Sequence, residues 1–282
     1  MPLNIPTFLT RTGSAIVFAA IMLTGLLWNE WTYFALIVLI HFFCINDYFR
    51  LAKKIELEAN WSVWFIIASQ ILGLLFITIL LMGNNSHYSF LLLFISPLMA
   101  CVPATIILLT AGGSEKNITP VLFSFGAVLY ISLPLGLFIS LRAIDHFIPL
   151  GLVLLIWVND TMAYISGSFF GRTPFSAASP KKTWEGTIGG IVCTMLIAIL
   201  FTYFKKGLHI QDWIILALCA SVAGTAGDLF ESKLKRLAGV KDSGNLMPGH
   251  GGALDRFDSL LVAIPFAFFY AYFFMEKFTF AP

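Results

Sequence analysis

The sequence predicts an all-α protein of about nine membrane-spanning helices, and three observations lead to this class. First, 59% of the 282 residues are hydrophobic and only 11% are charged, whereas soluble domains carry roughly 25% charged residues. Second, the mean hydropathy is +0.88. Third, the apolar residues gather in nine runs, and a helix of roughly 20 residues crosses the hydrocarbon core of a bilayer. A segment inside lipid must satisfy its own backbone hydrogen bonds, so we expect each run to be helical.

Taken in order, the nine runs leave room for short connections and for no sizeable soluble domain. The first run follows Arg11, as the apolar part of a signal peptide would. No small-residue cleavage site leads into a soluble mature domain, so we interpret this run as a span. The second run is short, and its boundary with the first is the least defined. The runs cover 13–28, 32–46, 62–82, 89–110, 120–141, 147–169, 187–204, 212–231 and 256–275.

This order suggests two regions. Residues 1–140 hold about five N-terminal helices, and residues 141–282 hold about four helices and two polar loops that would carry the chemistry. The stretch 47–61 mixes charged and apolar residues at helical spacing. It fits either an amphipathic extension of a span along the membrane interface or an ordinary solvated connector. All four cysteines lie in apolar runs, which favours buried apolar side chains over disulfides or a metal cluster.

Loop charge predicts how the nine helices are oriented. Counted on alternate sides, one side receives 13 Lys and Arg residues and the other receives four. Cytoplasmic loops carry the excess of Lys and Arg, so we expect a cytoplasmic N-terminus and a C-terminus on the opposite side. Both long polar loops, 171–186 and 232–255, then fall on the cytoplasmic face. We expect this face to belong to the plasma (inner) membrane of a bacterium.

Several carboxylates lie near or inside apolar runs, where a charge at the centre of a span costs roughly 2.5–3.5 kcal/mol on insertion scales. Such groups usually face a polar cavity and have partners there. The alternative is that they snorkel to the interface or form structural salt bridges near helix ends. The residues concerned are Asp160, which follows Asn159, then Asp228 and Glu231, and finally Asp255 and Asp258.

Helical spacing groups these carboxylates further. Asp228, Glu231 and Lys235 stand at i, i+3 and i+7, so they share one helix face. Asp255 and Asp258 are also i, i+3. Two helices with carboxylate pairs, joined by a loop of cations and glycines, can enclose a metal–phosphate cluster. Mg²⁺ takes one or two carboxylates plus substrate phosphate oxygens, and two metal ions can stabilise both the attacking and the leaving oxygen.

The loop between these helices is suited to phosphate. Cations and backbone N–H groups bind phosphate, and glycine lets the backbone approach it closely. His250 lies among the glycines and fits a phosphate donor, a proton-transfer group or a packing residue. A basic loop alone could bind anionic lipid heads, but the glycines and carboxylates make that interpretation less fitting. The cations are Lys235, Arg236, Lys241 and Arg256, and the glycines are Gly244, Gly249, Gly251 and Gly252.

The second polar loop lies within 171–190. Its polar residues could hold the phosphates or base of a nucleotide, and Trp184 could stack on a ring or anchor at the interface. The sequence has no GxxxxGK[ST] loop, no GxGxxG after a strand and no HExxH zinc site. Any nucleotide is therefore not bound by a soluble nucleotide-binding fold. The polar residues are Ser179, Lys181, Lys182, Thr183 and Glu185.

Together these residues resemble a known family, the phosphatidate cytidylyltransferases, also called CDP-diacylglycerol synthases. The segment 232–258 resembles the family's motif at the family's spacing, and the stretch SPKKTWEG and the pair Asn159–Asp160 also look like the family. The likeness covers most of the C-terminal half, while the first 140 residues match only in hydropathy. The matching positions of the motif are Ser232, Lys235, Arg236, Lys241, Asp242, Gly244, Pro248, His250, Gly251, Gly252, Asp255, Arg256 and Asp258.

The resemblance implies that CTP and phosphatidate give CDP-diacylglycerol and pyrophosphate, by metal-assisted attack of the lipid phosphate on the α-phosphate of CTP. It implies a Mg²⁺ site, with a second metal ion left open, in which Asp228 and Asp255 are the main ligands and Glu231 and Asp258 are further candidate ligands. Cations would neutralise the phosphates, as positioning and charge neutralisation suffice for this chemistry. Lys235, Lys241 and Arg256 would act with Asp228 and Asp255 in catalysis. Substrates would be held by Asn159, Asp160, Ser179, Lys181, Lys182, Arg236, Gly251, Gly252 and His250.

Two other functions remain open at this point. A CTP-dependent polyprenol or phytol kinase would donate the γ-phosphate to an alcohol, but the nearly complete motif disfavours it. A secondary transporter for a phosphorylated solute would use the carboxylates as ion sites, but the sequence shows no internal repeat and its polar groups gather at helix ends. The oligomeric state also stays open, and a homodimer is compatible with a small protein of many helices.

Overall fold

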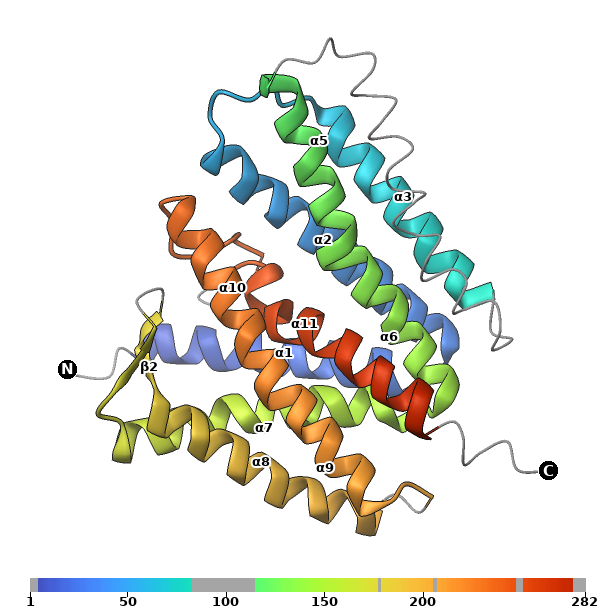
Figure 1. Cartoon of the computed structure of the whole chain (residues 1–282), viewed down its shortest axis with the longest axis vertical. Coiled ribbons are helices and arrows are strands. Elements are labelled where there is room, and N and C mark those ends of the chain that lie inside the picture. Colours follow the sequence, from blue (N-terminus) through green and yellow to red (C-terminus); the bar gives the residue numbers. More distant parts are fainter. Residues whose placement is uncertain (1–4, 83–114, 177–178, 205–206, 247–250, 276–282) are drawn as a thin grey trace. The chain divides into compact units, whose positions relative to one another are not determined.

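The computed structural model describes residues 5–82, 115–176, 179–204, 207–246 and 251–275, and most of them are helical (Figure 1). Seven helices are long and apolar enough to cross a membrane, and a shorter apolar stretch covers Thr12–Leu27. The chain is therefore an all-α integral membrane protein, as predicted. The expected run 89–110 lies outside the described residues, so the count of nine spans stays a prediction. The seven helices are Glu30–Ile55, Val63–Leu81, Ile118–Ile144, Phe147–Phe170, Trp184–Phe204, Ile210–Leu237 and Leu254–Met275.

The chain forms two compact units that are not consecutive halves. Unit 1 consists of Met1–Ile139 and Leu234–Phe257, and unit 2 consists of Ser140–Lys233 and Asp258–Pro282. The sequence suggests a division after residue 140, and one boundary between the units lies there. The segment 234–257, which the sequence assigns to the C-terminal region, packs with the N-terminal helices instead. Helices α10 (Gly224–Leu237) and α11 (Leu254–Tyr270) therefore each contribute residues to both units.

Unit 1 begins with a helix pair whose boundary is set by a local cap. The side chain of Asn29 accepts the Thr32 N–H at 2.9 Å, and the Thr32 hydroxyl accepts the Asn29 N–H at 3.0 Å. This reciprocal cap fixes the start of α2, which the apolar pattern leaves least defined. Residues 47–55 continue α2, which favours the helical extension over a connector. The elements are α1 (Ile5–Leu27), α2 (Glu30–Ile55), α3 (Val63–Met82), α5 (Glu115–Ala127), a π-helical turn η1 (Val128–Ser132) and most of α6 (Leu133–Ile144).

A buried polar contact lies in the core of unit 1. His41 Nε2 on α2 lies 2.9 Å from Ser132 Oγ in the π-helical turn, and both side chains are fully buried. Gly73 on α3 packs against both groups, so that a Cβ at this position would overlap them. Polar side chains inside a membrane protein commonly hydrogen-bond across helices in this way. The contact ties three helical segments together at one point.

Unit 2 contains a helical hairpin, α7 and α8, that is packed through small residues. The backbone of α8 at Gly186 and Gly190 lies against Ala163 and Gly167 of α7, and a Cβ at either α8 glycine would approach α7 atoms within 2.8 Å. Small residues four apart let membrane helices approach this closely. The elements are the end of α6, α7 (Phe147–Phe170), strands β1 (Pro174–Ser176) and β2 (Ser179–Thr183), α8 (Trp184–Phe204), α9 (Ile210–Leu218), a π-helical turn η2 (Cys219–Ala223), most of α10 and α11, and a π-helical turn η3 (Ala271–Met275).

The predicted loop between α7 and α8 contains a short antiparallel β-hairpin, which is a departure from the all-α expectation. Strands β1 and β2 pair with Pro174 opposite Thr183 and Ser176 opposite Ser179, and Figure 1 shows them at one end of the α7–α8 pair. Glu185 closes the base of the hairpin, because its carboxylate accepts the N–H of Arg172 and both the N–H and hydroxyl of Thr173 at 2.9–3.3 Å. The hairpin is therefore tied to the first turn of α8.

Candidate functional site

The first polar cluster lies in unit 2 and joins the β-hairpin to α10. The ammonium group of Lys182 on β2 forms an ion pair with Asp228 Oδ2, and both side chains are 28% exposed. The other carboxylate oxygen of Asp228 accepts the Ser232 hydroxyl at 3.2 Å. The contact brings together the two polar segments that the sequence marks separately. It leaves a partly exposed carboxylate and a partly exposed cation side by side.

Helix α11 approaches α10 closely beside this cluster. A Cβ at Gly227 would overlap the backbone carbonyl oxygen of Asp258, and a Cβ at Gly224 would be in ordinary contact with Ser259. Glycine at residue 227 thus allows the two backbones to touch next to Asp228. Glu231, one turn further along α10, is fully buried, and Asp258 is 8% exposed. Three carboxylates of unit 2 therefore lie on two helices in backbone contact.

These carboxylates fit Mg²⁺ by their chemistry. The donors are hard oxygen atoms, which Mg²⁺ prefers, and this ion needs only one or two protein carboxylates because water and phosphate oxygens complete its shell. In the part of the chain that the structure describes, no three His, Cys, Asp or Glu side chains converge as a ready-made metal cage.

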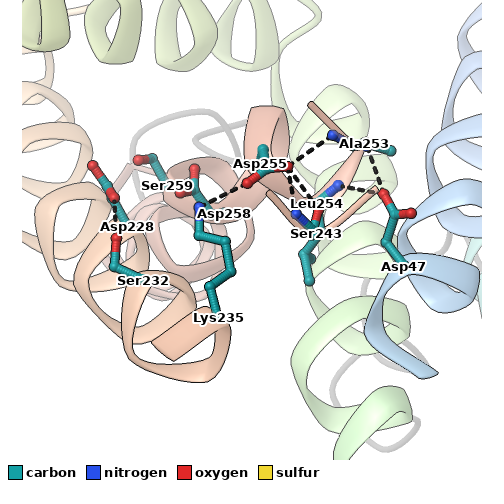
Figure 2. A network of polar contacts seen from close by, with 11 residues as sticks. Asp47, Asp228, Ser232, Lys235, Ser243, Ala253, Leu254, Asp255, Asp258 and Ser259 are labelled. Carbon is teal, nitrogen blue, oxygen red and sulfur yellow. Dashed lines mark hydrogen bonds and ion pairs between the residues drawn. The ribbon is translucent and has the colours of Figure 1, made fainter. Parts of the chain in front are cut away.

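The second polar cluster lies in unit 1 and centres on Asp255, as Figure 2 shows. Asp255 Oδ1 accepts the ammonium group of Lys235 at 2.7 Å. Its Oδ2 accepts the N–H and hydroxyl of Ser243, both at 2.9 Å, and the Gly252 N–H at 2.7 Å. The Asp255 side chain is only 6% exposed. Four donors on one carboxylate make a strong anchor, so Asp255 holds Ser243 and Gly252 of the segment that precedes α11.

Asp47 of α2 enters the same loop from the N-terminal part of the chain. Its Oδ2 accepts the N–H of Ala253 at 2.7 Å and that of Leu254 at 3.3 Å (Figure 2). The sequence analysis missed Asp47 as a site residue. A signal was present, because Asp47 ends an apolar run as Asp228 does, and the same argument would have marked it.

Three of the four expected phosphate-binding glycines face these carboxylates. A Cβ at Gly244 or at Gly252 would overlap the Asp47 carboxylate. Gly251 has φ +84, and a Cβ there would lie 2.6 Å from Asp255 Oδ2. The N–H of Gly252 is also used by Asp255. The small size of these residues is thus needed for packing against Asp47 and Asp255, and phosphate binding by Gly251 and Gly252 stays a prediction.

The other expected residues are distributed as follows. Lys181 is exposed beside Lys182, and Ser179 is half-buried in β2. On α7, Asn159 is 4% exposed and its Oδ1 has no hydrogen-bond partner among the described residues, whereas Asp160 is exposed. Substrate binding by Asn159 and Asp160 stays a prediction. The side chains of Arg236, Lys241 and Arg256 are exposed, and His250 lies outside the described residues.

Comparison with known proteins gives a consistent picture. Residues 9–274 match the model of the cytidylyltransferase family. The chain is 44% identical over 135 residues to a phosphatidate cytidylyltransferase of Haemophilus influenzae, covering 46% of each chain. It is 38% identical over 146 residues to one of Staphylococcus haemolyticus, covering 51% of this chain and 56% of that protein. The match thus spans about half the length of these curated relatives.

Proposed function

This chain belongs to the cytidylyltransferase family, and from this we propose that it joins CTP and phosphatidate to form CDP-diacylglycerol and pyrophosphate. Two relatives carry the name phosphatidate cytidylyltransferase. The structural observation that supports the proposal best is the ion pair of Lys182 with Asp228. It places a cation of the SPKKTWEG stretch beside a carboxylate of α10, and cation with carboxylate is what a metal–nucleotide site requires.

The proposed reaction is an in-line displacement. An oxygen of the phosphatidate phosphate attacks the α-phosphorus of CTP, the bond from that phosphorus to the bridging oxygen breaks, and pyrophosphate leaves with this oxygen. The lipid phosphate is already ionised near neutral pH, so the protein needs no strong base. Its contribution is positioning and charge neutralisation. Lys182, oriented by Asp228, is the proposed partner of the nucleotide phosphates, with Lys181 beside it.

Asp228 and Asp258 are the proposed Mg²⁺ ligands of unit 2, with Glu231 adjacent, and the ion would supply charge neutralisation to the phosphates. In unit 1, Asp255 remains a proposed metal ligand, and its four hydrogen bonds support a second role in holding the loop. Lys235, Arg236, Lys241 and Arg256 remain proposed phosphate partners. Binding of a second metal ion and formation of a homodimer also remain proposals.

The proposed topology places the N-terminus and both polar loops in the cytoplasm, where CTP is available. The support is the distribution of Lys and Arg, 13 on one side and four on the other if nine spans are present. Diacyl chains would then stay between the helices while CTP approaches from water.

The proposal is tested with purified protein in liposomes that contain phosphatidate. CTP labelled at the α-phosphate should pass its label into the organic phase, and EDTA should stop the transfer until Mg²⁺ is restored. Asp228→Asn should abolish transfer, whereas Glu58→Gln, at an exposed surface pair with Lys116, should not change it. In a parallel assay with CTP labelled at the γ-phosphate, transfer of label to an alcohol lipid would indicate a kinase instead. Absence of any transfer by folded wild-type protein would contradict the proposal.

A further inference from the structure

The first turn of α11 lacks a capping side chain of its own. The N–H groups of Arg256 and Phe257 bond to the carbonyl of Ala253 at 2.9 and 3.2 Å, so Ala253 occupies the N-cap position. An alanine side chain cannot accept the free N–H groups that every helix start leaves. Asp47 accepts two of them, those of Ala253 and Leu254, from a helix 206 and 207 residues away in the sequence.

The Asp47 carboxylate is also closely packed by two glycines. Gly244 and Gly252 lie against its carboxylate so closely that neither position has room for a Cβ. Gly244 follows Ser243, whose N–H and hydroxyl both donate to Asp255. Gly252 donates its own N–H to Asp255. The loop is thus held between two carboxylates, Asp47 on one side and Asp255 on the other. Movement of Asp47 must therefore alter the setting of Asp255 and of the adjacent Arg256.

We propose that Asp47 is a positioning residue for the cytidylyl transfer, acting through the capped turn of α11 and the loop that Asp255 anchors. The inference rests on the proposed function. Asp47 bonds to backbone groups and has no need to touch substrate. Its carboxylate fits the N-terminus of α11, because a negative charge is stabilised there. A small misplacement of reacting or charge-neutralising groups costs a large part of an enzymatic rate.

The kinetic test compares Asp47→Ala and Asp47→Asn with wild type and with Glu58→Ala, which removes an exposed carboxylate of the α2–α3 connection. Asp47→Ala should lower kcat roughly 10- to 100-fold, as loss of a supporting partner does in metal sites, while the KM for CTP changes little. Asp47→Asn keeps one oxygen acceptor, so its kcat should lie between those of wild type and Asp47→Ala. Loss of the cap should lower the melting temperature in the same detergent only slightly relative to Glu58→Ala. A fall in activity that a fall in melting temperature fully accounts for would overturn the proposal.

A double-mutant cycle tests the packing directly. Gly244→Ala inserts a methyl group where the Asp47 carboxylate lies, so it should lower kcat in the wild-type background. In the Asp47→Ala background the space is free, and the same change should cost much less. Gly13→Ala, at a position with nothing within 4 Å, serves as the control. Fully additive losses in kcat would count against the proposal.

Hydrogen exchange keeps this inference separate from the proposed activity. Peptides that cover 251–257 should exchange faster in Asp47→Ala, whereas peptides from the α7–α8 pair should not change. If wild-type protein transfers no nucleotide but exchange responds in this way, the proposed function fails and the capping by Asp47 stands. Unchanged exchange at 251–257 would refute the capping itself.

Discussion

Lys182, on the second strand of the β-hairpin, forms an ion pair with Asp228 on α10. Neither residue is close to the other in the sequence, and each lies in a segment that the sequence marks for phosphate or metal binding. Because both side chains remain partly exposed, the pair is accessible to a ligand. This contact is therefore the proposed centre of unit 2's chemistry.

Lys182→Gln should lower kcat/KM for CTP roughly 100-fold, in line with the loss of one group that stabilises developing charge. Combining it with Asp228→Asn should cost little more than the worse single change, because residues that act as a unit are not additive. The measurement is steady-state label transfer from CTP. Lys116→Gln, at an exposed surface pair, is the charge-matched control and should behave as wild type.

Glu185→Ala should loosen the base of the β-hairpin, because three donors from Arg172 and Thr173 lose their acceptor. Trypsin has cleavage sites in this hairpin at Arg172, Lys181 and Lys182. Cleavage there should become faster in the variant while other fragments appear at the wild-type rate. Equal cleavage rates at the hairpin would show that Glu185 does not hold it.

Gly227→Ala should destabilise unit 2 by about 1–3 kcal/mol, the usual cost of overpacking, because its methyl group would overlap the Asp258 carbonyl and press on Val262. The melting temperature in detergent reports the change. Gly13→Ala also adds one methyl to a helix but meets no neighbour within 4 Å. The melting temperature of Gly13→Ala should therefore equal that of wild type. A wild-type melting temperature for Gly227→Ala would show that α10 and α11 do not cross closely at this residue.

Ser132→Ala should cost about 1–3 kcal/mol, because it leaves His41 Nε2 buried without its partner. Replacing both groups, as in His41→Leu with Ser132→Ala, should cost less than the sum of the single changes. The ranking of the three melting temperatures checks this. Strict additivity would mean that the two side chains do not stabilise each other.

The charge distribution predicts opposite sides of the membrane for two exposed positions. In a variant without native cysteines, His146→Cys should react with an impermeant maleimide in intact cells, and Glu58→Cys should react only after permeabilisation. The reason is the excess of Lys and Arg on the side that carries residues 47–61. The reverse labelling pattern would invert the proposed orientation.

Hydropathy predicted the helices well because each span must form its backbone hydrogen bonds within one continuous segment. The α1–α2 boundary was uncertain in that pattern, since it is set by the Asn29–Thr32 cap and not by a change in hydropathy. The β-hairpin could not be foreseen from apolar periodicity, because its strands are short and its closure depends on the Glu185 carboxylate. The packing of 234–257 with the first helices likewise depends on contacts between distant segments.

The sequence marked individual candidate residues of the site but not their arrangement in space. The sequence marked Asp228 and Lys182, but nothing in their spacing showed that they touch. It marked Gly244 and Gly252 for phosphate, whereas the structure places carboxylate atoms against them. Asp47 ends an apolar run, as Asp228 does, so the sequence carried a signal for it, but its backbone partners leave no pattern of side-chain types to read.

The cap of α11 by Asp47 also has a consequence for the order in which the protein is made. Synthesis from the N-terminus delivers α2 to the membrane long before Ala253, 206 residues later, leaves the ribosome. Throughout that interval a carboxylate in the second helix lacks its final partners, and long-range contacts of this kind form late. Asp47 gains these partners only when α11 packs against α2. A chain interrupted before Ala253 therefore keeps, in its second helix, a carboxylate without these two backbone partners.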